Sequence, residues 1–438
     1  MKRRYAMIGA GPASVSAAQA VRSQDADGDI AIIGAEPYGY YSRPGLAYYL
    51  ADEVPEQQLF PFGAEDFARI NAQVILSRAV RIDPAGHQVM IEEGRTVAYD
   101  RLLVATGARA TPVNVPGADL DGVVSLDDLE DARRIIRLSR SAKAAVVVGG
   151  GITALEIVEG LCARRMKVHY FMRKDRYWSN VLSESESRIV EKGLQARGVE
   201  IHHFTELAEI IGGRGRVAAV RTEKGERIPC DMLAVAVGVL PQKELAEAAG
   251  LKCARGIVVD EHLHSSDEDI FAAGDVAEVC EPLTDRYTLE ILWSSAVAKG
   301  RVAGLNMSGD PKSIYEKGVP LNVTRLAGFK ISIMGTVGSG KDADLEGIAR
   351  GDSETWRRLS QAVTVESQAG GDHIRLALGE KTILGAVVMG DQTLSIPLQR
   401  LIAAHADVSL IREQLLQPGG SVGDLIQAYW ADWRVHHG

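Results

Sequence analysis

The sequence predicts an α/β fold made of two parallel-sheet units, one inserted in the other, with a small α+β unit at the C-terminal end. Two observations support this. A pattern of apolar run, glycine-rich turn, helical stretch and second apolar run occurs near the start and recurs near residue 144. Beyond about residue 315, alternation of apolar and polar residues replaces it. We therefore expect one unit of residues 1–112 and 242–315, an inserted unit of residues 113–241, and a final unit of residues 316–438.

Composition excludes several functional classes. The chain has 438 residues and a net charge of −9, which argues against a nucleic-acid partner because such a partner needs a concentrated basic face. Its apolar runs are too short to span a membrane. Gly9 and Gly11 interrupt the first apolar stretch, so we do not expect a signal peptide. We expect a cytoplasmic protein.

The cysteines are few and far apart: Cys162, Cys230, Cys253 and Cys280. They form no C-x-x-C pair and no closely spaced group, so the sequence predicts neither a disulfide framework nor an iron–sulfur cluster. We expect buried structural thiols and no metal site.

The first strand, residues 4–8, leads into a glycine-rich turn and a helical stretch that reaches residue 21. A second strand, residues 30–33, leads to Glu36, which is placed to accept hydrogen bonds from an adenosine ribose. Gly9 suits a tight turn, and Gly11 lets a pyrophosphate approach the backbone at the helix start. The pattern is that of a Rossmann-like dinucleotide-binding unit, and a glycine-rich turn without a ligand is the alternative. The candidate contacts are Gly9, Gly11, Pro12, Ala13, Ser14 and Glu36.

The second copy of the pattern argues against that alternative. Residues 144–148 form a strand, residues 149–154 a glycine turn, and a helix follows through residue 161. The next strand, residues 168–172, ends at Met172 where an acid would hold the 2′-hydroxyl of NADH. Arg173, Lys174 and Arg176 follow, and a cation there can pair with the 2′-phosphate of NADPH. A solvated basic loop is the other interpretation, so NADH and NADPH both stay open. Two dinucleotides imply hydride transfer from a nicotinamide to a flavin.

Four segments carry a resemblance to the flavin-dependent pyridine nucleotide–disulfide oxidoreductase superfamily: IGAGPAS, YDRLLVATGA at 99–108, VVVGGGITALE at 146–156 and DIFAAGDVAE at 269–278. The resemblance implies that Ala105, Thr106 and Gly107 mark the crossover between the flavin and nicotinamide units. It also implies that Gly274 and Asp275 meet the ribityl chain of the flavin. We expect a helix to start at Asp275.

The resemblance implies further site residues. Glu156 matches a position on the nicotinamide side of the flavin, with an ordinary helix charge as the alternative. The segment 289–304 is similar to a helix whose N-terminus faces the flavin pyrimidine, which would place Trp293 and Ser294 in contact. Core packing of Trp293 is the alternative. Other cofactor contacts implied by the resemblance are Val80, Gly149, Gly151, Ile152, Arg173 and Gly238.

The sequence departs from the family where a redox cysteine would stand, because Pro44 occupies that place. Without a thiolate nucleophile we do not expect reduction of disulfides, coenzyme A disulfide or peroxide. The stretch Tyr41-Ser42-Arg43-Pro44 is similar to rubredoxin reductases, ferredoxin reductases and the flavoprotein half of NAD(P)H nitrite reductases. That similarity implies that Arg43 and Pro44 lie at the flavin and that Arg43 and Glu156 act in the reaction. Tyr48 replaces a lysine of many ferredoxin reductases, which favours the nitrite and rubredoxin reductase side.

The C-terminal unit is expected to be a small sheet with helices at residues 394–404 and 422–433. Its strands are expected at 322–337, 374–378 and 383–389, with a polar stretch at 338–354. The phrase ILGAVVMGDQTLSIPLQRLI resembles the C-terminal module of nitrite-reductase-like flavoproteins. For Tyr429, Trp430 and Trp433 we expect core packing, with a partner or dimer contact as the alternative.

The resemblance therefore implies an FAD-dependent NAD(P)H oxidoreductase that passes electrons to a separate iron–sulfur, rubredoxin or haem protein, with homodimerisation a family expectation only. Two alternatives stay open: a type II NADH:quinone reductase, and a flavin-binding interaction subunit of a larger redox complex.

Overall fold

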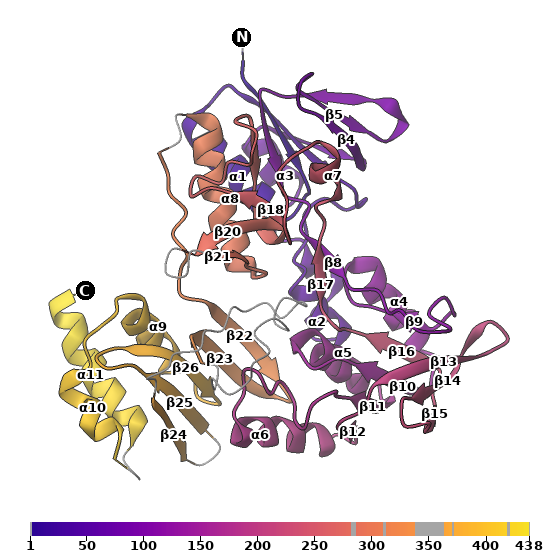
Figure 1. Cartoon of the computed structure of the whole chain (residues 1–438), viewed down its shortest axis with the longest axis vertical. Coiled ribbons are helices and arrows are strands. Elements are labelled where there is room, and N and C mark those ends of the chain that lie inside the picture. The colour runs from indigo at the N-terminus through magenta and orange to yellow at the C-terminus, as the bar shows by residue number, and fades with distance from the viewer. Residues whose placement is uncertain are drawn as a thin grey trace.

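The structure is a computed structural model that describes residues 2–281, 286–309, 312–337, 363–369, 372–417 and 421–437. Its elements gather into three groups (Figure 1). The N-terminal strands and α8 form the upper group, the elements from α4 to β16 form the lower right group, and the C-terminal elements form the lower left group. Within the described ranges, no helix is long and apolar enough to cross a membrane.

A five-stranded parallel sheet forms the centre of the upper group, in the order β19-β7-β1-β2-β3. Its strands are β1 (Arg4–Ile8), β2 (Asp29–Gly34), β3 (Ala72–Leu76), β7 (Arg101–Val104) and β19 (Ile270–Ala272). Helices α1 (Pro12–Gln24) and α8 (Trp293–Ser308) pack closely against each other. A Cβ at Gly300 would lie 2.1 Å from the carbonyl oxygen of Ala13, so glycine is needed where α8 crosses α1. This contact joins segments almost 300 residues apart.

A second five-stranded parallel sheet forms the lower right group, in the order β12-β11-β10-β16-β9. Its strands are β9 (Val123–Val124), β10 (Ala144–Val148), β11 (Lys167–Phe171), β12 (Glu200–His202) and β16 (Met232–Val235). Its helices are α4 (Leu129–Ser139), α5 (Ile152–Ala163) and α6 (Glu184–Gln195). The antiparallel pair β8 (Ala108–Ala110) and β17 (Val239–Pro241) connects this group to the upper one.

The C-terminal group is an antiparallel sheet with the order β22-β23-β26-β25-β24. Its strands are β22 (Leu321–Leu326), β23 (Phe329–Gly335), β24 (Val363–Ala369), β25 (Asp372–Leu378) and β26 (Ile383–Met389). Helices α9 (Ser395–Ala403), α10 (Ser409–Leu415) and α11 (Val422–His437) pack on this sheet. Tyr429, Trp430 and Trp433 pack against its core, which favours their expected structural role.

The remaining elements are short. The helices are α2 (Gly45–Leu50), α3 (Ala64–Arg69) and α7 (Glu244–Ala248), and the 3₁₀ turns are η1 (Glu56–Leu59), η2 (Glu92–Gly94) and η3 (Gly274–Val276). The strands are β4 (Ala79–Asp83), β5 (Gln88–Ile91), β6 (Thr96–Ala98), β13 (Leu207–Gly213), β14 (Arg216–Thr222), β15 (Arg227–Pro229), β18 (Ile257–Val259), β20 (Ala277–Glu281) and β21 (Arg286–Leu289).

The expected fold class is confirmed, and most expected elements lie within a few residues of their predicted bounds. One expectation is wrong: Asp275 lies in a single 3₁₀ turn followed by strand β20, so no helix starts there. The predicted segment 322–337 is a hairpin of two strands, because Ala327 and Gly328 adopt positive φ between them. Helix α10 and strand β24 were not predicted from the sequence, and the polar stretch 338–354 lies outside the described residues.

Candidate functional site

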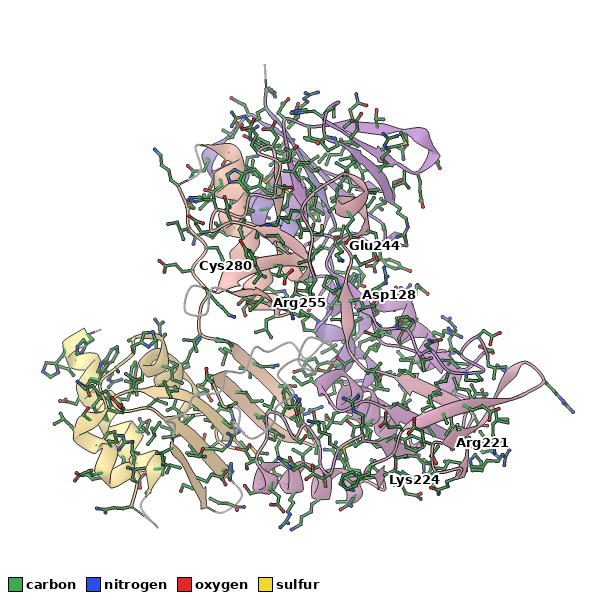
Figure 2. The ribbon with its side chains drawn as sticks, viewed as in Figure 1. Asp128, Arg221, Lys224, Glu244, Arg255 and Cys280 are labelled. Carbon is green, nitrogen blue, oxygen red and sulfur yellow. The ribbon has the colours of Figure 1, made fainter. Side chains whose placement is uncertain are left out.

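A cavity of about 1470 Å³ lies where the three groups of elements meet. Both glycine turns, the segment from Arg43 to Tyr48, Trp293 and the first residues of β22 line it. Glu244 and Asp128 are labelled in Figure 2 near the connecting pair β8 and β17. Glu244 lines the cavity, and Asp128 is the N-cap of α4. The structure thus brings together segments that are widely separated in the sequence.

The first glycine turn is closed on one side and open on the other. Gly9 has a φ of 111°, and a Cβ there would lie 2.1 Å from the carbonyl oxygen of Ala105. A Cβ at Gly11 would meet nothing within 4 Å, and Gly11 lines the cavity just before α1 begins at Pro12. The turn therefore leaves room for a ligand at the N-terminus of α1, where unpaired amides favour an anion.

The second glycine turn has the same construction. Gly149 has a φ of 151°, and a Cβ there would lie 2.2 Å from the carbonyl oxygen of Ala236. Gly150 is open, and α5 begins at Ile152 on the wall of the cavity. Two helix N-termini therefore open onto one cavity.

Glu36 and Arg43, predicted as separate contacts, belong to one network. A guanidinium nitrogen of Arg43 lies 2.6 Å from the Glu36 carboxylate, and the Tyr41 hydroxyl donates to that carboxylate at 2.6 Å. Arg43 also donates to the backbone carbonyl of Asp127, whose carboxylate lies 3.8 Å away. Burial raises the pKa of Asp127. Sequence reasoning missed Asp127, because no local motif marks it.

Asp275 lines the cavity at the η3 turn, and burial raises its pKa to about 6. Behind it lies the fully buried side chain of Lys299, whose amine donates to the carbonyls of Gly274 and Ala277 at 3.3 Å. The same amine lies 3.6 Å from the Glu290 carboxylate. Lys299 was not among the predicted site residues, although a lysine among the small residues of α8 is a visible signal in the sequence.

Glu156 lines the cavity one turn into α5, and burial raises the pKa of its carboxyl to about 7, with a smaller contribution from Glu159. No cation pairs with it in the described part of the chain, whereas Glu159 lies 2.7 Å from Arg197. Tyr48, at 40% exposure, lines the cavity and a small adjoining pocket with Glu156. The structure thus places Tyr48 and Glu156 on the wall of the same small pocket.

Trp293 begins α8 on the cavity wall, and its side chain is 51% exposed. Its indole N–H donates to the Tyr40 hydroxyl at 3.4 Å. Core packing of Trp293 is therefore excluded, because half of the residue is in contact with solvent. Ser294 lines the same wall.

The end of β11 has the expected basic residues. Met172 is buried against the cavity, Lys174 donates to Asn180 at 2.7 Å, and Arg176 contacts Asp175 at 2.9 Å. Arg173 is exposed and lines the cavity, and among the described residues it has no ion pair. Arg173 is therefore available to a ligand.

Most of the predicted contacts line this one cavity: Gly9, Gly11, Pro12, Ala13, Glu36, Arg43, Pro44, Thr106, Gly107, Gly149, Gly151, Ile152, Glu156, Arg173, Gly238, Gly274, Asp275 and Trp293. Three do not. Ser14 is buried, and its hydroxyl has no hydrogen-bond partner among the described residues. Ala105 is buried beneath Gly9, and Val80 is 46% exposed next to Ala79, which does line the cavity.

The four cysteines lie outside the cavity wall. Cys230 is buried, as expected, but the other three are only partly buried, which corrects the expectation for them. Burial raises the pKa of Cys162 to about 11 and that of Cys230 to about 12, so these thiols resist ionisation.

Comparison with known proteins gives relatives along nearly the full chain. Over 429 residues the chain is 32% identical to the "Biphenyl dioxygenase system ferredoxin--NAD(+) reductase component" of Paraburkholderia xenovorans, covering 97% of this chain and 98% of that protein. It is 32% identical to "Rubredoxin-NAD(+) reductase" of Ectopseudomonas oleovorans, over 63% of this chain and 72% of that one. It is 26% identical to "Nitrite reductase [NAD(P)H]" of Bacillus subtilis, over 95% of this chain and 49% of that one.

A solved structure of a reductase also has the same fold as this chain. The reductase in the covalent putidaredoxin reductase–putidaredoxin complex superposes with a TM-score of 0.84 at 25% identity, covering 97% of this chain and 98% of that one. Residues 3–300 match the family described as pyridine nucleotide-disulphide oxidoreductase. With both glycine turns opening onto one cavity and this match over most of the chain, the protein belongs to the pyridine nucleotide-disulphide oxidoreductase family.

Proposed function

We propose that this protein is an FAD-dependent NAD(P)H oxidoreductase that passes electrons to a separate small redox protein. The observation that carries the proposal is that two glycine turns, each at a helix N-terminus, open onto one cavity. Two bound dinucleotides would then lie with their reactive ends close together, which is what hydride transfer requires.

The residues present fit FAD at the first turn. The side of Gly11 that faces the cavity is open, so a pyrophosphate can reach the amides at the start of α1. Glu36 and Asp275 would accept hydrogen bonds from the adenosine ribose and the ribityl chain, and Arg43 would hold Glu36 in place. When bound, FAD supplies the ability to accept a hydride and to release its electrons to an acceptor.

The second turn would hold the nicotinamide dinucleotide. The open side of Gly150 and the N-terminus of α5 suit its pyrophosphate, and Arg173 suits a 2′-phosphate. On this assignment residues 1–112 and 242–315 bind FAD, residues 113–241 bind NAD(P)H, and residues 316–438 form an interface unit.

The acceptor is proposed to be an iron–sulfur, rubredoxin or haem-type protein. Two relatives similar to this chain are named as reductases of ferredoxin and of rubredoxin, which supports an acceptor of this class. In this chain, exposed Trp293 at the cavity wall offers an apolar contact for such a partner. Homodimerisation and a cytoplasmic location stay predictions.

Anaerobic stopped-flow reduction tests the proposal. The FAD-loaded protein should lose its flavin absorption on mixing with NADPH or NADH and recover it when an oxidised [2Fe–2S] ferredoxin or a rubredoxin is added. A protein that cannot bind FAD, or that neither nucleotide reduces, contradicts the proposal. If a quinone reoxidises the flavin and the protein sediments with liposomes, the quinone reductase alternative is favoured. If NAD(P)H reduces the flavin but no acceptor supports turnover, the interaction subunit is favoured.

A further inference from the structure

Three side chains with lone-pair donors converge on adjacent strands of the second sheet, and none of the three lines the cavity. His169 lies on β11, and Glu200 and His202 lie on the edge strand β12, with His169 paired in register to Glu200. One donor atom from each residue lies within 4.8 Å of the other two. In the described part of the chain, this is the one group of three or more histidine, cysteine or acidic side chains so placed.

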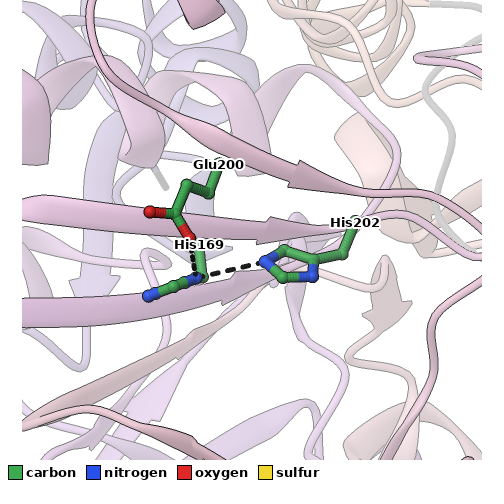
Figure 3. Close-up of side chains that lie close together, drawn as sticks. All are labelled: His169, Glu200 and His202. Carbon is green, nitrogen blue, oxygen red and sulfur yellow. Dashed lines mark hydrogen bonds and ion pairs between the residues drawn. The ribbon is translucent and has the colours of Figure 1, made fainter.

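The contacts within this group compete for one atom. Nδ1 of His169 lies 3.1 Å from Nε2 of His202 and also 3.1 Å from Oε2 of Glu200 (Figure 3). If Nδ1 carries a proton, its single N–H is shared between two acceptors; if it does not, it faces the lone pairs of the carboxylate. A cation placed between the three atoms would satisfy all of them at once.

We propose that His169, Glu200 and His202 form a binding site for a divalent transition-metal cation of the zinc type. Two imidazoles and one carboxylate are a donor set that zinc accepts, with a fourth position left for water. Nitrogen donors disfavour Mg²⁺ and Ca²⁺, which prefer oxygen ligands.

The surroundings support the proposal. The other carboxylate oxygen of Glu200 lies 2.8 Å from the Lys167 amine, which would orient Glu200 as a ligand through one oxygen. Glu200 is half exposed, which leaves a path for the ion from solvent.

The test is calorimetric titration of ZnCl₂ into the full-length chain, purified without an affinity tag and treated with EDTA before desalting. The double variant His436→Asn/His437→Asn serves as the background, because these exposed C-terminal histidines could hold a cation loosely. One Zn²⁺ should bind per chain, and MgCl₂ should give no binding. Glu200→Gln is the mildest site variant, since its side chain is half exposed and the change disturbs the fold least.

Glu200→Gln and His202→Asn should each weaken Zn²⁺ binding by at least about 10-fold, because even groups that only support a ligand contribute this much. His203→Asn is the matched control. His203 follows His202 in the chain, but its Nε2 lies 3.2 Å from the Glu191 carboxylate, so the affinity for Zn²⁺ should not change. Bound Co²⁺ should give d–d absorption at wavelengths beyond the flavin bands. The variant His202→Asn should abolish this Co²⁺ absorption. No stoichiometric Zn²⁺ in the background protein, or equal binding by His202→Asn, overturns the proposal.

Discussion

Arg43 and Glu36 form an ion pair of 2.6 Å on the wall of the cavity, and the same guanidinium reaches Asp127. One cation thus connects the segment after β2 to the residues just before α4. The carboxylate expected to meet the adenosine ribose is therefore fixed by a residue expected to meet the flavin.

Arg43→Met should weaken FAD binding by at least about 10-fold. Removing the cation leaves Glu36 and Asp127 without their shared partner, and a hydrogen bond to a charged group contributes roughly 1.5–3 kcal/mol. Flavin fluorescence during equilibrium dialysis measures the affinity. Arg69→Met is the control, because that exposed arginine pairs with Asp66 away from the cavity wall. Unchanged FAD affinity in Arg43→Met would show that the network does not support the cofactor.

Glu156→Gln should make the protein more stable than the wild type at alkaline pH. The pKa of Glu156 rises from 4.5 to about 7 in the folded protein, so its contribution to stability is present below pH 4.5 and is lost as the pH rises through 7. At pH 8 the variant should gain about 3 kcal/mol, and below about pH 4 the difference should vanish. Urea unfolding at fixed FAD concentration checks this. The exposed Glu413→Gln should follow the wild type, and a pH-independent difference for Glu156→Gln would contradict the prediction.

Lys299→Met should destabilise the protein by roughly 3–5 kcal/mol, because it leaves the buried Glu290 carboxylate without its cation. The double variant Lys299→Met/Glu290→Gln should recover part of that loss, since both charges are then removed. Urea unfolding of the two single variants and the double variant gives the coupling between the residues. Additive losses would mean that the 3.6 Å contact between them contributes nothing.

Trp293→Ala should slow electron transfer to the protein acceptor by more than about 10-fold, since an exposed tryptophan that a partner covers often dominates the binding energy of the interface. Reduction of FAD by NAD(P)H should not change. The two half-reactions are separated by stopped-flow measurement. Leu410→Ala is the control, because Leu410 is 88% exposed on α10 and does not line the cavity. Equal slowing of both half-reactions would place Trp293 in FAD binding instead.

Arg173→Ala should lower kcat/KM for NADPH by about 10-fold, the effect of losing one charged hydrogen bond, and leave kcat/KM for NADH nearly unchanged. Arg188→Ala in α6 is the control, since its exposed side chain pairs with Glu184. Steady-state assays with NADPH and with NADH measure the two kcat/KM values. If only NADH supports turnover in the wild type, the basic segment after β11 is a solvated loop.

The glycine turns were predictable because each depends on a short stretch of chain. Strand, glycine and helix signals lie next to one another at Gly9 and again at Gly149, and the backbone conformation they require is local. The same local logic failed at Asp275, where a residue typical of a helix start lies in a 3₁₀ turn that leads into a strand.

By itself the sequence determined that this chain has two nucleotide-type turns, no redox cysteine where its family would place one, and a separate C-terminal sheet. Only the tertiary structure decided that Arg43 bridges Glu36 and Asp127, that Lys299 lies against Glu290, and that His169 meets the edge strand β12. Arg43 and Asp127 are 84 residues apart, and His169 meets a strand that begins only after helix α6, so the folded chain alone brings them into contact. The Glu36 and Glu290 contacts are closer in sequence, but each depends on a chain path between elements that no local pattern specifies.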